Sequence, residues 1–551
     1  MTTALDLHDI QGNIVFGYGR YGYPKARYIF FKFNGGVTGR EFVKQLADLI
    51  TTSAPLDKQR EGVDKPDSTT NIAFTYKGLQ KLNIPDESLR SFPDEYRMGM
   101  KARAAILGDD QVSSPEHWDP IWQDESKQVH MWMSINGASE TCVDERYNLV
   151  LEILDNVNST SDQSKQVELL SGHRGAKGQD NLPYQSASAI YKDYEVGTGE
   201  TKKTLSLPTN KEHFGYSDGI SNPYFKGMSS NPEDCIGGGA TTGKDPATEA
   251  GWKPIDTGEF VLGHRDETNE YPAAPVPRLL SYNGSFMVYR KLHENVGSFE
   301  EYTEKTGEKF DGGSEAVKAK FSGRWPNGAP MATYPTLADA EAFGNELEAA
   351  MFTLFINPET KDKENKEVRK KYEKLKLSMV AFDYEDTING SKCPVGAHMR
   401  RTNPRGALEF GKDGAFNTPG ALVDRRRILR RGLPYGDSSD RTSNKGDHGI
   451  IFIAINSNIE RQFEFVQQQW INYGNDYKLS NTKDPILGNH KASESGCPMG
   501  RNIIDGDSET GRLPHMCANM PRFVETRGGD YFFIPSMTAI RMIGEGIIDP
   551  T

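Results

Sequence analysis

Three segments of the chain carry side chains that could do chemistry together. They are HFGYSDGISNP, CPVGAHMRRTNPR and RILRRGLPYG, and they contain Asp218, His398 and Arg430. An imidazole can bind a metal, a carboxylate can accept and return a proton, and a permanently charged guanidinium can stabilise a developing anion. These residue types suit a metal-containing cofactor with a small reacting molecule beside it.

His398 is followed by a group of arginines, Arg400, Arg401 and Arg405. A haem presents iron to a neutral imidazole nitrogen, and it presents two propionates to cations, which a guanidinium can bind in bidentate fashion. The pattern therefore suits a haem ligand. Taken alone, any one of the eleven histidines is more often a surface or hydrogen-bonded residue.

Asp218 and Arg430 each have an ordinary interpretation as well. Gly215 and Gly219 in the motif G-x-x-D-G let the backbone bend closely around a group such as a porphyrin. From local chemistry alone, an aspartate in such a motif is more often a turn former that hydrogen-bonds its own backbone. Arg430 lies in a run of arginines, which usually forms a solvated or partner-binding face, and a shift of one residue would make Arg431 the candidate.

Two glycine-rich motifs have the spacing of nucleotide-binding loops, but the residues next to them do not fit that function. The G-x-G-x-x-G at residues 17–22 should open a helix to bind a dinucleotide, but Tyr23-Pro24 leads into another strand. We interpret it as a turn. Residues 238–244 have phosphate-loop spacing, but position 245 is Asp, where a hydroxyl should reach magnesium. Neither segment predicts a nucleotide site.

The apolar pattern predicts two similar halves. In the first, strand-like runs occupy residues 27–33, 71–76, 130–135 and 167–170, with helices opened by Thr38 and Glu41 and over residues 144–155. In the second, strands are expected at 285–289, 377–382, 449–455 and 530–534, with helices opened by Ser298 and by Ser457. The second of these helices covers residues 459–471.

Each half reads as β-α-β-β-α-β, so we predict an α+β protein of two ferredoxin-like domains with antiparallel sheets. The boundary is placed loosely near residue 275, which gives domains of residues 1–275 and 276–551. Polar or glycine-rich segments at residues 226–254, 358–376 and 492–512 are expected to be loops or surface insertions.

Composition and charge narrow the class of protein. With 36% apolar and 26% charged residues the chain is an ordinary globular protein, and a net charge of -12 without a basic stripe disfavours nucleic acid. Neither a signal peptide nor a membrane-spanning stretch is visible, so we expect a cytoplasmic protein that does not bind membranes. Five scattered cysteines without a C-x-x-C pair argue against a disulfide framework and a covalent c-type haem. A homo-oligomer is compatible with the sequence.

Taken together, the three segments resemble the dye-decolourising (DyP-type) haem peroxidases. The resemblance extends in order to DIQGNIVFGYG, GEFVLGH, IIFIAINSNIERQFEFVQQQW and DYFFIPS, and so covers most of the chain. It implies a non-covalent haem b with the antiparallel sheets packed around it. It also implies an enzyme that reduces hydrogen peroxide while oxidising dyes, phenols and other aromatic donors by one-electron steps.

The resemblance also assigns roles to individual residues. It makes His398 the proximal iron ligand, Asp218 the distal proton shuttle and, through the match to R-x-G-x-P-Y-G, Arg430 the distal arginine. The arginine of the N-P-R turn, Arg405, would contact a propionate. The residues after Asp218 would contact the haem, and they are Gly219, Ile220 and Ser221.

Further positions are less distinctive. Asp484, in the segment DPILG, resembles the family's proximal acid, which would accept a hydrogen bond from His398, although a surface loop acid is nearly as good an interpretation. Tyr435 and Trp470 stand where relatives place residues that relay electrons, and Trp470 fits a helix-core stripe equally well. The rival functions are a haem carrier or sensor and a protein that releases haem iron. Asp218 and Arg430 argue against a carrier, which needs neither.

Overall fold

The computed structural model describes residues 5–54, 66–175, 179–229, 232–356, 365–384, 389–408, 421–437, 443–491 and 500–549. One antiparallel sheet runs through both halves of the chain, with the strand order β13-β15-β12-β18-β2-β3-β1-β4. Two short strands flank this path, because β14 pairs with β15 and β7 (Gln185–Ser188) pairs with β1. The two halves meet where β18 and β2 share the residue pair Phe533 and Phe74.

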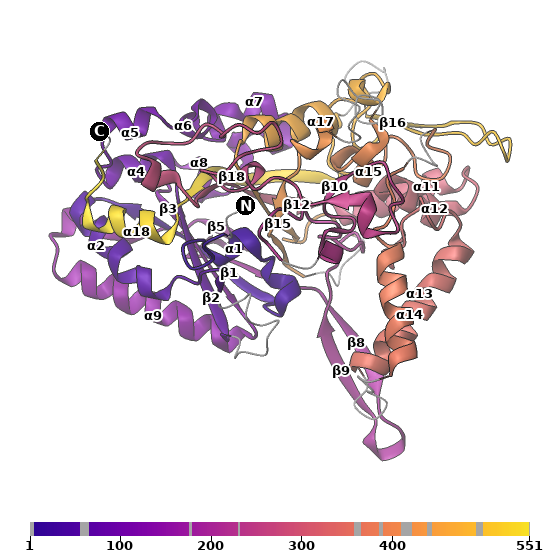
Figure 1. Ribbon diagram of the computed structural model, residues 1–551, viewed down its shortest axis with the longest axis horizontal. Helices are drawn as coiled ribbons and strands as arrows, with labels where there is room; N and C mark the ends of the chain where they lie inside the picture. Colours follow the sequence, from indigo (N-terminus) through magenta and orange to yellow (C-terminus); the bar gives the residue numbers. More distant parts are fainter. Residues whose placement is uncertain are drawn as a thin grey trace.

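The amino-terminal half has the predicted β-α-β-β-α-β order. Its elements are β1 (Lys25–Phe33), α2 (Gly36–Leu46), β2 (Ser68–Phe74), β3 (Met131–Gly137), α9 (Glu140–Ser159) and β4 (Val167–Leu169). The helices α2 and α9 pack together, and α18 (Met537–Glu545) packs on α2 (Figure 1). The strands are almost entirely buried, as their apolar runs predict. The predicted start of α2 is wrong, because the helix begins after Gly35 and encloses Thr38.

The carboxyl-terminal half repeats the unit with one strand in an unexpected place. Its elements are β12 (Ser285–Glu294), α11 (Val296–Gly307), β13 (Leu429–Arg430), β14 (Leu433–Tyr435), β15 (Gly449–Asn456), helical turns at Glu460–Glu464 and Val466–Ile471, and β18 (Val524–Ile534). Residues 377–382, predicted as a strand, instead form the end of α14 (Lys366–Ser378) and a turn. Their apolar side chains pack on loops: Val380 lies against Gly237, and the Phe382 ring lies 4.0 Å from the Arg405 guanidinium. The outer strand beside β15 is formed by β13 and β14.

Two further helix starts differ from the capping-box predictions. The N-cap of α11 is Asn295, directly after β12, so Ser298 lies in the first turn of the helix. The helix after β15 is capped by Asn458 rather than Ser457, because the Asn458 side chain accepts the Arg461 N–H at 2.7 Å. The polar pair thus lies inside the helix at Ser298 and begins one residue too early at Ser457, so capping-box spacing alone did not locate either helix start.

Insertions project from this body (Figure 1). The hairpin of β8 (Tyr191–Val196) and β9 (Lys203–Pro208) extends beside the pair α13 (Leu337–Met351) and α14, and Lys192 contacts Glu348 at 2.6 Å. Segment 358–376, expected to be a loop or a surface insertion, contains most of α14, and its residues 358–364 lie outside the described part of the chain. Segment 492–512 contains β16 (Arg501–Ile504), while its residues 492–499 lie outside the described part of the chain.

Within the described residues, none of the helices is both long enough and apolar enough for a membrane span.

Candidate active site

His398, Asp218 and Arg430 line one cavity, whose walls come from residues 212–223 and from residues 292–524. Its empty volume, including the mouth, is about 1220 Å³. The sheet supplies part of the apolar lining with Leu292 from β12, Ile450 and Phe452 from β15 and Val524 from β18, and the rest comes from Phe214, Phe463, Val466, Ile471, Ile486 and Leu487. An apolar space with a few convergent polar groups is typical of cofactor sites.

His398 begins the short helix α15 (His398–Thr402) and is oriented by a buried acid. Its Nδ1 lies 2.9 Å from Oδ2 of Asp484, whose side chain is fully buried. The other carboxylate oxygen of Asp484 accepts the backbone N–H groups of Ile486 and Leu487, both at 2.8 Å. Because Nδ1 is engaged, Nε2 is the ring nitrogen that remains for a metal.

The electrostatics of this pair favour a carboxylate beside an electron-rich imidazole. Burial by itself lowers the pKa of His398, but the Asp484 charge and hydrogen bond raise it, and the net pKa lies above its ordinary value. Burial raises the pKa of Asp484, whereas His398 and the Leu487 N–H lower it, so the net pKa lies below its ordinary value. Asp484 therefore stays ionised and accepts the Nδ1 hydrogen.

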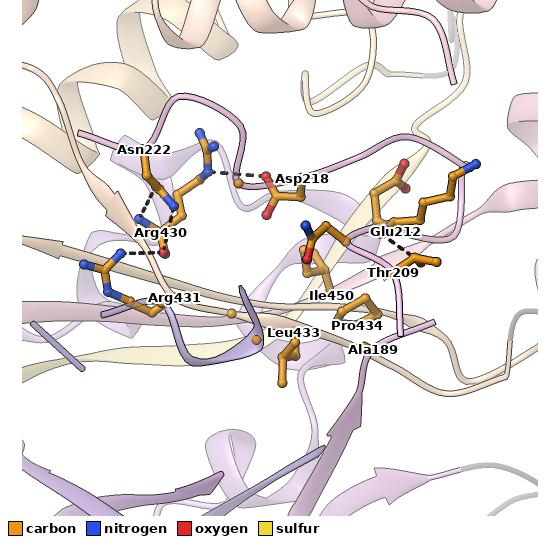
Figure 2. Close-up of a pocket in the computed structure, with 16 residues that line it drawn as sticks. Ala189, Thr209, Glu212, Asp218, Asn222, Arg430, Arg431, Leu433, Pro434 and Ile450 are labelled. Carbon is orange, nitrogen blue, oxygen red and sulfur yellow. Dashed lines mark hydrogen bonds and ion pairs between the residues drawn. The ribbon is translucent and has the colours of Figure 1, made fainter. Parts of the chain in front are cut away.

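Asp218 and Arg430 form an ion pair on the same cavity. Arg430 Nε lies 3.3 Å from Asp218 Oδ1, and Figure 2 shows the two side chains directed toward each other. Arg430 comes from β13, where it pairs with Ala454 of β15, and its Nη2 donates to the Ile220 carbonyl at 3.1 Å. Its backbone N–H donates to Asn222 Oδ1 at 3.0 Å. The loop after Asp218 therefore holds the guanidinium in place.

Arg431, the alternative to Arg430, is committed elsewhere. Its Nε donates to the Asn13 carbonyl at 2.6 Å and its Nη2 to the Ile14 carbonyl at 2.7 Å, both in α1 (Gly12–Val15). It does not line the large cavity. The structure thus brings Arg430, and not Arg431, to Asp218.

A second pocket leads from Asp218 and Arg430 toward the glycine-rich turn at residues 17–22. Its empty volume is about 590 Å³, and it shares Glu212, Asp218, Arg430 and Ile450 with the large cavity (Figure 2). Gly19 forms part of its wall, and a Cβ there would lie 2.9 Å from Leu433 Cδ2. The turn predicted from residues 17–22 thus has a role at the site that its motif did not indicate.

The other residues expected to bind the cofactor are only partly exposed to the cavity. Ser221 lines it, Gly219 lines the adjoining pocket, and the Ile220 carbonyl accepts from Arg430. Arg405 does not line the cavity. Its Nη2 donates to Ser221 Oγ at 2.9 Å and its Nη1 to the Val380 carbonyl at 2.7 Å, and burial lowers the pKa of Arg405 to about 9.

Arg427 is a cavity residue that the sequence reasoning missed. It lines the cavity, its Nη2 donates to the Ser221 carbonyl at 3.0 Å, and burial lowers its pKa to about 10. In the sequence it is one of several neighbouring arginines, and nothing in the local pattern separates it from Arg425 or Arg426. Its place three residues before Arg430 is the one feature of the sequence that could have pointed to a position at the site.

Tyr435 and Trp470 are both buried, and neither lines the cavity. Tyr435 belongs to β14, with its carbonyl 2.8 Å from His213 Nε2 and its ring beneath the Lys291 ammonium at 4.8 Å. Trp470 donates to Asp476 at 3.0 Å, and its ring packs against Phe465 and Tyr477. Trp470 is adjacent in sequence to the cavity residue Ile471.

Comparison with known protein families matches both halves of the chain. Residues 9–173 match a model described as the DyP dimeric alpha+beta barrel domain. Residues 279–496 match a model described as the Dyp-type peroxidase, C-terminal domain.

Individual proteins give the same result over nearly the whole chain. Peroxidase 2 of Mycetinis scorodonius is 25% identical over 553 residues, which is 98% of this chain and 88% of that protein. The solved structure of an ancestral D-type dye-decolorizing peroxidase superposes with a TM-score of 0.70 at 26% identity, covering 98% of this chain and 99% of that one. A dye-decolorizing peroxidase in complex with 2,6-dimethoxyphenol superposes with a TM-score of 0.66 at 25% identity, covering 98% and 100%.

Proposed function

The chain belongs to the family of DyP-type haem peroxidases, and from this premise we propose that His398 binds the haem iron while Asp218 and Arg430 act on the peroxide. Its activity is that of a peroxidase, which reduces hydrogen peroxide and oxidises dyes and phenolic or other aromatic donors. One observation carries the assignment of residues: His398 lines the same cavity as the Asp218–Arg430 pair.

The residues present fit a non-covalent haem b. The apolar lining suits the porphyrin, and His398 has Nε2 available because Nδ1 is engaged by Asp484. No cysteine of the described residues lines the cavity, which supports non-covalent binding. A haem bound there would supply an iron that binds peroxide and stores its oxidising equivalents.

Arg427 and Ser221 are our candidates for the propionate end of the cavity. Arg427 brings a buried positive charge to the lining, and a propionate would relieve the cost of burying it. Arg405 takes a supporting role in this proposal, because its guanidinium holds the Ser221 hydroxyl rather than facing the cavity. This differs from the direct propionate contact that the resemblance implies for Arg405.

Asp218 and Arg430 would divide the chemistry of peroxide cleavage. Asp218 accepts a proton from one peroxide oxygen and returns it to the other, which leaves as water. Arg430 cannot move that proton, but its fixed charge stabilises the negative charge that develops as the O–O bond breaks. The Ile220 carbonyl holds the guanidinium in position beforehand, and Asn222 holds the backbone N–H of Arg430.

The donors we propose are dyes, phenols and other aromatic compounds. Those that fit the pocket beside Asp218 can approach the site directly, whereas larger ones need a residue that passes electrons through the protein. Trp470 and Tyr435 are candidates for this relay. Trp470 has the better position, because its ring contacts Phe465 and Tyr477 and its neighbour Ile471 lines the cavity.

The absorption spectrum of the purified protein tests the proposal. We expect a Soret band of histidine-bound haem that changes on addition of one equivalent of peroxide and returns when a dye is added. A haem spectrum that does not respond to peroxide would indicate a carrier or sensor. Free protoporphyrin after incubation with haem would indicate iron release.

A further inference from the structure

Glu294 is a cavity acid that the mechanism above does not use. It is the last residue of β12, and it lines the cavity together with Asp218 and Glu212. Only 3% of its surface is exposed. Among the described residues, one hydrogen bond reaches its carboxyl group, from the His213 backbone N–H to Oε2 at 3.1 Å.

No lysine, arginine or histidine of the described residues forms an ion pair with Glu294, so a negative charge there would be buried without a cation. Of the two arginines that line the cavity, Arg430 is paired with Asp218 and Arg427 donates to the Ser221 carbonyl. Glu212 adds a second carboxylate, held by the N–H groups of Phe214 and Tyr216 at 2.6 and 2.7 Å. A buried carboxylate without a cation takes up a proton instead of staying ionised.

The other groups around Glu294 agree with a protonated acid. Burial and then the Glu212 carboxylate raise the pKa of Glu294, the hydrogen bond from the His213 N–H lowers it, and the Asp218 charge raises it further, so the net pKa lies well above its ordinary value. The titratable groups on neighbouring elements are His293 on β12, Tyr435 on β14, His448 before β15 and Glu525 on β18. Burial and the nearby Arg527 lower the pKa of His293 to about 4, so this imidazole adds no positive charge at neutral pH.

The peroxidase reaction needs protons beyond the one that Asp218 moves. When the O–O bond breaks, one oxygen leaves as water with that proton, and Asp218 returns to its starting state. The oxygen left in the cavity becomes water only after it receives two electrons and two protons. Donors oxidised outside the cavity supply the electrons but release their protons to solvent, so an acid that lines the cavity is needed to pass protons on to the buried oxygen.

We propose that Glu294 is this acid: its carboxyl O–H bond breaks and a new O–H bond forms on the oxygen that remains in the cavity, as one donor electron arrives. The Glu294 carboxylate then regains a proton from solvent through the pocket that Glu212 shares with the cavity, and a second transfer of the same kind, with the second donor electron, completes the water molecule. This inference rests on the proposed peroxidase site, and it assigns Glu294 to the reduction steps only.

Infrared spectroscopy of the holoenzyme tests the protonation state directly. We expect the parental protein at neutral pH to show a carboxylic-acid C=O band that is absent in Glu294→Gln and shifted in Glu294→Asp. Glu525→Gln, which removes an acid on the neighbouring strand outside the cavity lining, should leave that band in place. Identical carboxylic-acid bands in Glu294→Gln and the parent would overturn the proposal.

Stopped-flow kinetics test the transfer. After one equivalent of peroxide, the enzyme is mixed with ferrocyanide, a donor that brings no proton. A general acid speeds a proton-transfer step by about 10²–10⁴-fold. The rate of this reduction should therefore fall by about 10²-fold in Glu294→Gln, and its solvent deuterium isotope effect should disappear. Glu294→Asp should recover part of the rate. Its reaction with peroxide should stay parental.

The melting temperature and the Soret band show whether the Glu294→Gln protein is correctly folded. If the folded variant is reduced by ferrocyanide at the parental rate, the proposal is also overturned. A variant that is slowed in the peroxide step would place Glu294 with Asp218 instead and contradict the assignment. Failure of the proposed function is distinguishable, because the parental protein itself would then not react with peroxide.

Discussion

His398 and Asp484 are joined by a hydrogen bond of 2.9 Å between Nδ1 and Oδ2, although 86 residues separate them in the sequence. Asp484 cannot rotate away, because its second oxygen accepts two backbone N–H groups. The imidazole is therefore oriented by the protein itself, with Nε2 left for iron. An acid in this position makes a ligand histidine more electron-rich.

Replacing Asp484 should tune the iron without releasing it. Asp484→Asn removes the negative charge behind His398, so the imidazole donates less electron density and the reduction potential rises. The haem should stay bound. A spectroelectrochemical titration of the two proteins measures this directly, and equal potentials would show that Asp484 does not act on the iron through His398.

His398 itself should be required for the haem. His398→Ala removes the imidazole that lines the cavity, and we expect loss of most haem or of its normal Soret band. His515→Ala, which changes a histidine of β17 (His515–Ala518) outside the cavity lining, is the matched control and should keep both. Haem content and spectrum that are parental in His398→Ala would remove His398 as the ligand.

Gly432 has a direct effect on the position of Arg430. A Cβ at Gly432 would lie 1.6 Å from the Ile451 carbonyl oxygen of β15, so Gly432→Ala must displace the connection between β13 and β14. Overpacking of this kind costs about 1–3 kcal/mol, and we expect a lower melting temperature together with slower reaction with peroxide. At Gly406 a Cβ would meet only Thr241 Oγ1 at 3.7 Å, so Gly406→Ala should be close to parental. Equal behaviour of the two variants would contradict the geometry at Gly432.

Large and small donors should respond differently to loss of the proposed relay. Replacing Tyr435 and Trp470 together by Phe keeps an aromatic ring at each position but removes the phenol and the indole, which are easier to oxidise than a phenyl ring. Turnover of bulky dyes should fall, while small phenols that reach the pocket beside Asp218 keep their rate. Tyr28→Phe, at another buried tyrosine outside the cavity lining, serves as the control. If the double variant slows both donor classes alike, the two residues only support the fold.

Local pattern was enough to predict most strands and the family, but not the complete lining of the site. The strands β1, β12, β15 and β18 were recognisable because each contains an apolar run, although the predictions at residues 285–289 and 530–534 covered only the apolar parts of β12 and β18. The same signal failed at residues 377–382, since a short apolar run at a helix end looks like a buried strand.

The missed site residues depend on contacts between distant segments. Arg427 and Glu294 line the cavity only because β12, the Ser221 loop and the segment before β13 meet there, and neither residue stands in a distinctive local motif. Arg405 has such a motif, but its guanidinium is held by Ser221 and the Val380 carbonyl. Its role at the haem stays a prediction.

The roles of Asp218 and Arg430 should differ in kind, because a carboxylate can move a proton and an arginine can only stabilise charge. Rapid mixing of the haem-loaded protein with peroxide across a range of pH measures this through the rate of the Soret change. Asp218→Asn should react much more slowly and lose the decline toward acid pH that protonation of a carboxylate base produces. Arg430→Leu should react slowly with that decline retained, and both variants should bind haem.

The most direct test of the account is this measurement on Asp218→Asn. We predict a rate constant for peroxide about 10²-fold or more below the parental value, the usual contribution of a general base, with a flat pH profile on the acid side. If the variant reacts at the parental rate and with the parental pH profile, Asp218 is not the proton shuttle. Arg430, alone or with water, would then have to carry the chemistry of peroxide cleavage.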